Sequence, residues 1–148
     1  MTSGMSLIVR TVTRLAVTFI ILFGIYVALY GHLSPGGGFA GGAIAAAGFI
    51  LLLLAFGHQH TKNILAHDDA IAWDCAGALA FLLVAVLGYV AGTFFINFLS
   101  SGEPYQLASA GTIPIVNMAI GAKVGAGLFG VFLALAAFRS IKQRENKS

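Results

Sequence analysis

The sequence predicts an all-α integral membrane protein with about four transmembrane helices, and composition and length support this prediction. Hydrophobic residues make up 59% of the 148 positions, charged residues make up only 9%, and the mean hydropathy is +0.94. An ordinary soluble domain carries roughly 25% charged residues, so this chain cannot cover itself with polar surface in water. An apolar run of roughly 20 residues spans a bilayer, so four spans use most of the length and leave only short connections.

Four apolar runs follow one another, and we expect each to form one span of a single membrane domain, 1–148. The runs cover residues 15–30, 39–56, 70–99 and 113–138, and a basic tail follows at 139–148. The third and fourth runs exceed the minimum length, so we expect a tilt or a break there. Arg10 and Arg14 before the first run are also typical of a secretory signal. No small-x-small cleavage site follows, however, and further spans come after.

The distribution of basic residues predicts the orientation. Most of them lie near the two ends of the chain and one lies in the middle connection: Arg10, Arg14, Lys62, Arg139, Lys142, Arg144 and Lys147. The connections at 31–38 and 100–112 contain neither Lys nor Arg. By the positive-inside rule, both termini and the middle connection face the cytoplasm, which requires an even number of spans. Membrane topology therefore explains the net charge of +3 better than binding to nucleic acid does.

The densest motif lies at the predicted outer end of the first two runs. It reads Gly31-His32-Leu33-Ser34-Pro35-Gly36-Gly37-Gly38-Phe39-Ala40-Gly41-Gly42. Proline fixes one dihedral angle and glycines permit backbone paths closed to other residues, so a specific turn is expected. A phosphate-binding loop is excluded because the preceding strand and the following Lys are missing. The turn is either structural or lines an ion or water path, in which His32 would relay protons or form hydrogen bonds at the interface.

Two charged residues lie inside apolar runs. Lys123 stands roughly 24 Å along the helix from Arg139, and Asp74 lies roughly 7 Å inside the third run, by the helical rise. We therefore expect Lys123 in the outer part of the membrane and Asp74 near the cytoplasmic edge beside Trp73, too far apart to pair. An intramembrane charge favours a functional role, for which each residue needs a different partner. Snorkelling of Lys123 and hydration of Asp74 are the alternatives.

Small residues at helical spacing predict faces that dock other helices, in this chain or in partner subunits. These residues are Gly41, Ala45, Gly48, Gly88, Gly92, Gly121 and Gly125. The single cysteine, Cys75, excludes an intramolecular disulfide and is expected to be buried. Pro114 and Asn117 predict an irregular start of the fourth helix. The ligand types near the middle connection match no metal-site spacing, so no metal site is expected there; they are His58, His60, His67, Asp68 and Asp69.

The glycine-rich turn and a second segment together resemble one known family. The second segment comprises Gly111-Thr112-Ile113-Pro114 followed by Asn117, Gly121, Lys123, Gly125 and Gly127. Over nearly its whole length, the chain resembles the B subunit of Mrp/Mnh multisubunit sodium/proton antiporters. The same subunit type recurs in membrane-bound hydrogenases and related sulfur-reducing complexes. The residues that match the family motif are His32, Pro35, Gly36, Gly37, Gly38, Phe39 and Lys123, whereas Ala40 stands where many relatives are expected to have Gln.

This resemblance implies a four-helix subunit of the cell membrane, packed among other small and large antiporter-type subunits. The assembly would exchange sodium ions and protons. This chain would bind no cofactor. In a hydrogenase-type host, which also has peripheral subunits, the redox centres would lie in other polypeptides. Three roles remain open: a subunit that forms part of the ion path, a scaffold, and a self-contained transporter or membrane enzyme. No nucleophile and base pattern supports an enzyme.

Overall fold

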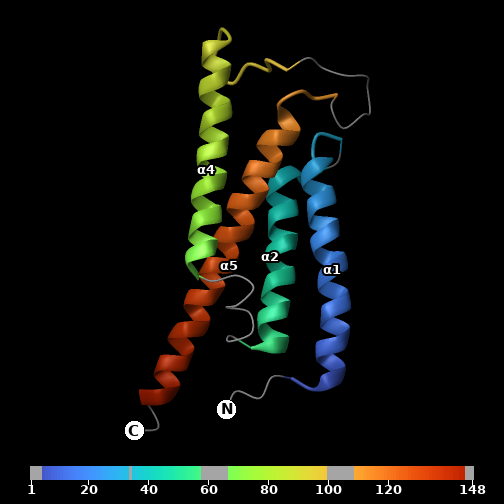
Figure 1. The fold of residues 1–148 in the computed structure, drawn as a ribbon, viewed down its shortest axis with the longest axis vertical. Helices are drawn as coiled ribbons and strands as arrows, with labels where there is room; N and C mark the ends of the chain where they lie inside the picture. Colours follow the sequence, from blue (N-terminus) through green and yellow to red (C-terminus); the bar gives the residue numbers. More distant parts are fainter. Residues whose placement is uncertain (1–4, 34, 58–66, 100–108, 146–148) are drawn as a thin grey trace.

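The computed structural model describes residues 5–33, 35–57, 67–99 and 109–145, and these ranges contain four helices and no strand (Figure 1). The helices are α1 (Leu7–Leu29), α2 (Gly37–Phe56), α4 (His67–Val90) and α5 (Ile113–Glu145). Each is long and apolar enough to cross a membrane. The predicted all-α membrane fold with four spans is confirmed.

The four helices form an open layer rather than a closed bundle. Helices α1 and α2 pack as an antiparallel hairpin, α5 crosses beside α2, and α4 lies on the far side of α5 (Figure 1). Among the described helices, α4 packs extensively against α5 and meets α2 at a small shared core. The start of α1 and the end of α5 lie at the same end of the molecule, as an even number of spans requires.

The first helix begins earlier than predicted, at Leu7 rather than at residue 15, so that it includes both arginines of the N-terminal segment. The guanidinium groups of Arg10 and Arg14 lie 5.9 and 5.6 Å from the centre of the Phe56 ring at the end of α2. A ring face attracts a cation at this distance. The arginines are therefore accommodated within the helix, beside the end of its neighbour.

The third helix ends earlier than predicted, at Val90 rather than at residue 99. Gly92 has a φ of +141°, a conformation that a helix does not contain and that glycine adopts readily. The chain then folds back, so that the Phe95 ring lies 5.1 Å from the Phe81 ring. The apolar run at 70–99 is therefore one helix followed by an apolar segment that folds back on its end.

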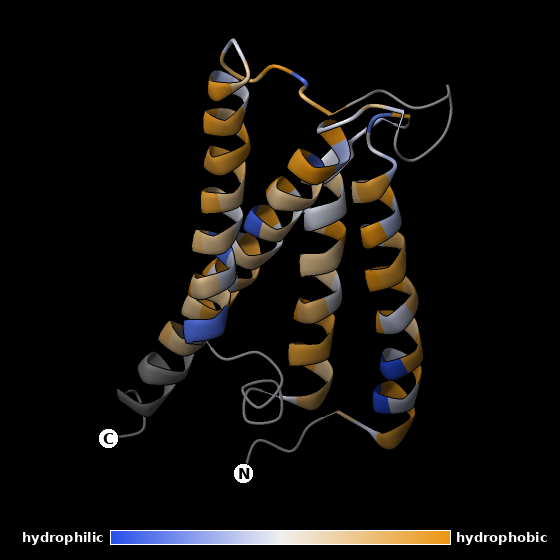
Figure 2. Ribbon diagram, turned by 45° about the horizontal axis from the view of Figure 1, so that its top comes forward, coloured by the Kyte–Doolittle hydropathy of each residue, from blue (hydrophilic) through white to orange (hydrophobic). Residues whose placement is uncertain are grey.

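The core is small and lies where α2, α4 and α5 meet. Leu53, Ala70, Phe129 and Leu133 form the buried cluster, and the Phe49 ring packs 5.8 Å from the Phe129 ring. Within the apolar window of each span, only 22–33% of the residues are buried in this chain. Hydrophobic residues predominate along each helix (Figure 2), and many large ones are exposed, which suits contact with lipid or with other membrane proteins.

Candidate functional site

The glycine-rich turn joins α1 to α2 at the end of the molecule opposite the two termini, which the sequence predicts to be the outer end, and it depends on two left-handed glycines. Gly36 and Gly37 have φ values of +120° and +55°. A side chain is strained in this region of backbone conformation, whereas glycine is not. The turn therefore reverses the chain within a few residues and starts α2 at Gly37.

The start of α2 packs directly on the start of α5. A Cβ atom added to Gly38 would overlap the backbone carbonyl of Asn117, and one added to Gly31 would overlap the Cα atom of Gly37 and lie 2.7 Å from the Asn117 side chain. Only glycine permits this approach of backbone to backbone. The two segments that carry the family resemblance thus meet at one place.

A line of close backbone contacts continues from the turn along α2. Gly41 packs on Gly24 of α1, while Gly42 lies against Gly121 and Gly125 of α5. A Cβ atom at Gly125 would lie 3.2 Å from the Gly42 carbonyl oxygen. Small residues allow membrane helices to approach closely, so these glycines hold α2 between its two neighbours.

The other predicted packing residues have different surroundings. Gly48 faces the side chains of Ile20 and Ile21 on α1, whereas Gly88 packs against the chain's own returning segment at 95–96. Gly92 lies beyond the end of α4 with nothing within 4 Å of the position of a Cβ atom. The structure therefore does not place the predicted pair of Gly88 and Gly92 on a face that docks another helix of this chain.

The other predicted residues of the turn differ in their exposure. His32 is half-buried and its Nδ1 atom is buried. Pro35 and Phe39 are exposed, and the Phe39 side chain is 64% accessible. The Phe39 side chain therefore points away from the rest of the described chain.

Lys123 and Asp74 form an ion pair, so the prediction that they lie too far apart to pair is wrong. The Nζ atom of Lys123 donates a hydrogen bond of 2.8 Å to Oδ1 of Asp74. Both residues lie within the segments that can cross a membrane, Ile113–Phe138 and Asp68–Val90. The pair joins α4 to α5 by a charge-assisted hydrogen bond.

The axial offset between α4 and α5 explains this pairing. The depth of Lys123 was counted from Arg139, but α5 continues to Glu145 and runs obliquely across the layer (Figure 1). Helix α4 also begins level with the middle of α5 rather than with its end. A Cβ atom at Gly77 would lie 2.7 Å from the Ala119 carbonyl oxygen, so Gly77 and Ala119 are at the same level. Asp74 and Lys123 each lie about one helical turn from this contact, in the same direction because the two helices are antiparallel.

The ion pair is only partly covered by this chain. The Lys123 side chain is 50% accessible and the Asp74 side chain is 38% accessible. Such a pair contributes little in water, but hydrocarbon solvates charge poorly, so charged groups within membranes face other protein or a water-filled cavity. The single thiol, Cys75, is next to Asp74 on α4 and is exposed, so the prediction that it is buried is wrong.

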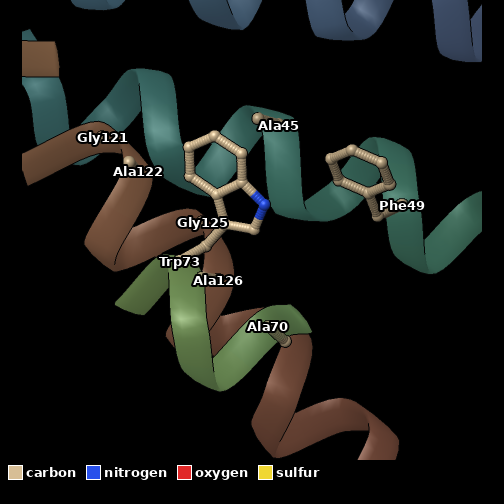
Figure 3. A pocket seen from close by; sticks show the side chains of 8 residues that line it. All are labelled: Ala45, Phe49, Ala70, Trp73, Gly121, Ala122, Gly125 and Ala126. Atoms are coloured by element: carbon tan, nitrogen blue, oxygen red, sulfur yellow. The ribbon is translucent and has the colours of Figure 1, made fainter. Parts of the chain in front are cut away.

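An apolar pocket lies between α2, α4 and α5 (Figure 3). Its volume is about 270 Å³, and its lining comprises Ala45, Phe49, Ala70, Trp73, Gly121, Ala122, Gly125 and Ala126. Neither Lys123 nor Asp74 lines it. At 100° per residue, Trp73 and Asp74 leave α4 on different sides of its contact with α5. The pocket and the ion pair therefore lie on opposite faces of the layer.

Asn97 organises the second outer connection, a role that the sequence did not reveal. Its Nδ2 group donates a 3.1 Å hydrogen bond to the Ala110 carbonyl oxygen. Its Oδ1 atom accepts hydrogen bonds from the Thr112 amide at 3.0 Å and the Thr112 hydroxyl at 3.2 Å. One side chain thus ties the segment after α4 to the start of α5. An Asn within a long apolar run was the only available signal.

Among the residues that the structure describes, no group of three or more metal-ligand side chains is brought together. His58 and His60 of the middle connection lie outside the described residues. His67 begins α4, followed by Asp68 and Asp69. The described residues therefore offer no candidate metal site beyond the ligand types already named from the sequence.

The four long apolar helices define a multi-pass membrane protein. The chain matches the family model of the domain related to the MnhB subunit of the Na⁺/H⁺ antiporter over residues 8–130, and it belongs to this family. It is 38% identical over 112 residues to a Staphylococcus aureus protein named as antiporter subunit mnhB2, a match that covers 74% of this chain and 72% of that protein.

Two further relatives extend the comparison. An uncharacterised protein of Methanocaldococcus jannaschii is 36% identical over 135 residues, which cover 86% of this chain and 51% of the relative. A chain of the membrane-bound sulfane sulfur reductase, an archaeal respiratory membrane complex, has a TM-score of 0.74 at 33% identity, covering 88% of this chain and 58% of that one. The present chain therefore spans only about half the length of these two relatives.

Proposed function

We propose that this chain is the B-type subunit of a multisubunit cation/proton antiporter module, in which it helps to form or support the ion path. Membership of the MnhB-related family and similarity to the staphylococcal subunit support this role. The transported species would be sodium ions and protons, and the chain itself would hold no cofactor. Its partners would be other small and large antiporter-type membrane subunits.

The observation that carries the proposal is the ion pair of Lys123 and Asp74 within two membrane-spanning helices. A carboxylate and an ammonium at this depth are costly in lipid and are typical of ion and proton routes through membrane proteins. The glycine turn supports the same role, since irregular backbone near the membrane needs cover by protein or a cavity. His32, in this turn, would take part near the outer face.

The proposal is tested by replacing Lys123 with Ala in the intact assembly and measuring sodium-driven proton movement in everted membrane vesicles. A hydrogen bond to a charged group contributes about 1.5–3 kcal/mol, so we expect exchange to fall roughly ten- to hundredfold. Lys123→Arg, which keeps the positive charge, should retain most of the exchange. Unchanged exchange by the Lys123→Ala assembly, at equal subunit content, would reduce this chain to a scaffold.

A second kind of complex could contain this subunit, and one specific observation favours it: the similarity to a chain of the membrane-bound sulfane sulfur reductase. In that case the same antiporter-type subunit would serve a respiratory or hydrogenase-related complex, with the redox chemistry in other chains. Mass spectrometry of the assembly purified through this chain separates the two hosts. Redox subunits in the purified complex indicate the respiratory host, and antiporter subunits without them indicate the antiporter.

A further inference from the structure

The ion pair marks one face of the α4 and α5 layer that this chain leaves open. Helix α4 packs extensively on α5 and meets α2 at the core and at the apolar pocket, and the two charged side chains stay 38% and 50% accessible. In a bilayer, this face would present charged groups to hydrocarbon unless something covers it. Intramembrane charges almost always face protein or water, so a cover is required.

The hydrogen-bonding groups of the pair specify the chemistry of that cover. An ammonium has three N–H donors, and Lys123 uses one of them on Oδ1 of Asp74. No other hydrogen bond of either side chain is formed within the described ranges of the chain. The pair is neutral as a whole, so a third charge beside it would stand uncompensated in a medium of low dielectric constant. A neutral side chain with both a donor and an acceptor fits these groups best.

Apolar residues surround the ion pair on the same face. On α4, helical spacing places Ile71, Ala78 and Phe81 beside Asp74, and Ile71 and Phe81 are 51% and 37% accessible. On α5, Gly130 lies seven residues from Lys123, with nothing within 4 Å of the position of a Cβ atom. Between membrane helices, polar side chains form hydrogen bonds across an otherwise apolar contact, and this face has the same composition.

From these observations we infer that this face, defined by Ile71, Asp74, Ala78, Phe81 and Lys123, docks a transmembrane helix of another subunit. The docking helix presents a carboxamide or hydroxyl side chain that accepts a hydrogen bond from Lys123 and donates one to Asp74. The inference rests on the proposed function, since it identifies the surface through which the subunit joins its assembly. Lipid and an open water channel are the competing covers.

The first experiment removes the polar centre while keeping the helix contact apolar. The double variant Asp74→Leu with Lys123→Leu is expressed alone and together with the other subunits of the assembly. Replacing an ion pair by apolar residues is often neutral or stabilising, so we expect the chain alone to unfold in detergent at an unchanged or higher temperature. Loss of two hydrogen bonds between membrane helices should lower co-purification of the other subunits about tenfold.

The matched control is Ala72→Leu, which adds apolar bulk at the same depth on the opposite side of α4. This variant should co-purify with the other subunits at the level of the unmodified chain. Co-purification of the double variant at that same level would overturn the inference, because lipid or water would then serve equally well as the cover of the ion pair.

The second experiment does not depend on how well the double variant folds. A photo-reactive benzoylphenylalanine replaces either Ile71, on the docking face, or Ala72, on the opposite side, in the assembled complex. Irradiation should join position 71 to a peptide of another subunit that contains an amide or hydroxyl side chain, in higher yield than from position 72. Lipid adducts alone at position 71, or no adduct, would overturn the inference.

Sodium-driven proton movement in the same samples separates this inference from the proposed function. If position 71 cross-links to another subunit while Lys123→Ala leaves exchange unchanged, the docking face stands and the transport role fails. If exchange depends on Lys123 while position 71 yields only lipid adducts, the docking helix fails and the transport role stands.

Discussion

At the scale of single residues, the pairing of Lys123 with Asp74 is the most informative feature of the molecule. A lone ammonium in hydrocarbon is costly, and the 2.8 Å contact with a carboxylate neutralises it without removing either group from the membrane-spanning segments. Partial exposure of both side chains leaves them able to interact with a neighbouring subunit or with water. The pair is therefore suited to an assembly more than to an isolated chain.

Glycine at position 38 is the second residue on which the fold depends. A Cβ atom there would overlap the Asn117 carbonyl, so Gly38→Ala must push α2 away from α5. We expect a loss of about 2–3 kcal/mol in stability, as is typical of overpacking. Thermal unfolding of the purified chain in detergent measures this effect.

The control for this prediction is Gly130→Ala, the same substitution in a helix where a Cβ atom would meet nothing within 4 Å. Alanine favours a helix over glycine by up to about 1 kcal/mol, so Gly130→Ala should be neutral or stabilising. Equal unfolding temperatures for the two variants would contradict the packing that we describe at Gly38.

The sequence predicts these residues better than it predicts their contacts. An embedded Lys and a glycine-rich turn are visible in the sequence because both are unusual in an apolar chain. The partner of Lys123 was not predictable from helical rise alone. Depth along a helix equals depth in the membrane only for an untilted helix, whereas α5 runs obliquely and α4 is displaced along it.

At the scale of helices and connections, α5 holds the layer together. It contacts α2 through glycines on one side and α4 through Gly77 and the ion pair on the other. Its start is fixed by the Asn97 side chain, which ties residues on both sides of the outer connection. This tie adds to the direct contacts of α5 with α4, which is the only extensive helix contact of α4 among the described residues.

Asn97→Ala should therefore loosen the outer end of α4 relative to α5. The change removes three hydrogen bonds, and we expect the Thr112 amide to exchange its hydrogen at least tenfold faster in detergent. Mass spectrometry of hydrogen exchange over 109–116 measures this rate. Asn97→Asp keeps the acceptor for Thr112 and should have a smaller effect, whereas equal rates in Asn97→Ala and the unmodified chain would contradict the role of this side chain.

The number and type of helices follow from the sequence, but three of the helix ends do not: the start of α1, the end of α4, and the end of α5, which continues to Glu145. Apolar runs and the lengths of the connections predict four spans, because each span must satisfy its own backbone in lipid. The same apolar signal continues past Val90 and hides the reversal at Gly92. The early start of α1 brings Arg10 and Arg14 beside Phe56 of another helix, a contact that no local pattern reveals.

At the scale of the whole molecule, the open layer is incomplete as a membrane structure. Most residues in each span are not buried by this chain, one face carries a partly covered ion pair, and the opposite face carries an apolar pocket. Membership of the MnhB-related family gives a reason for this shape. In the proposed role as a subunit, the uncovered surfaces would contact neighbouring subunits. The composition of the chain predicts the membrane, whereas the assembly is indicated by the resemblance and by the uncovered charges.

The most direct test of the account is to reconstitute the assembly into liposomes with and without this chain and to measure sodium-driven proton movement. The complete assembly should exchange sodium ions for protons, while this chain alone and the assembly that lacks it should show no exchange above the background of empty liposomes. Exchange by the purified chain alone would make it a self-contained transporter. Full exchange by the assembly that lacks it would show that the chain has no part in transport.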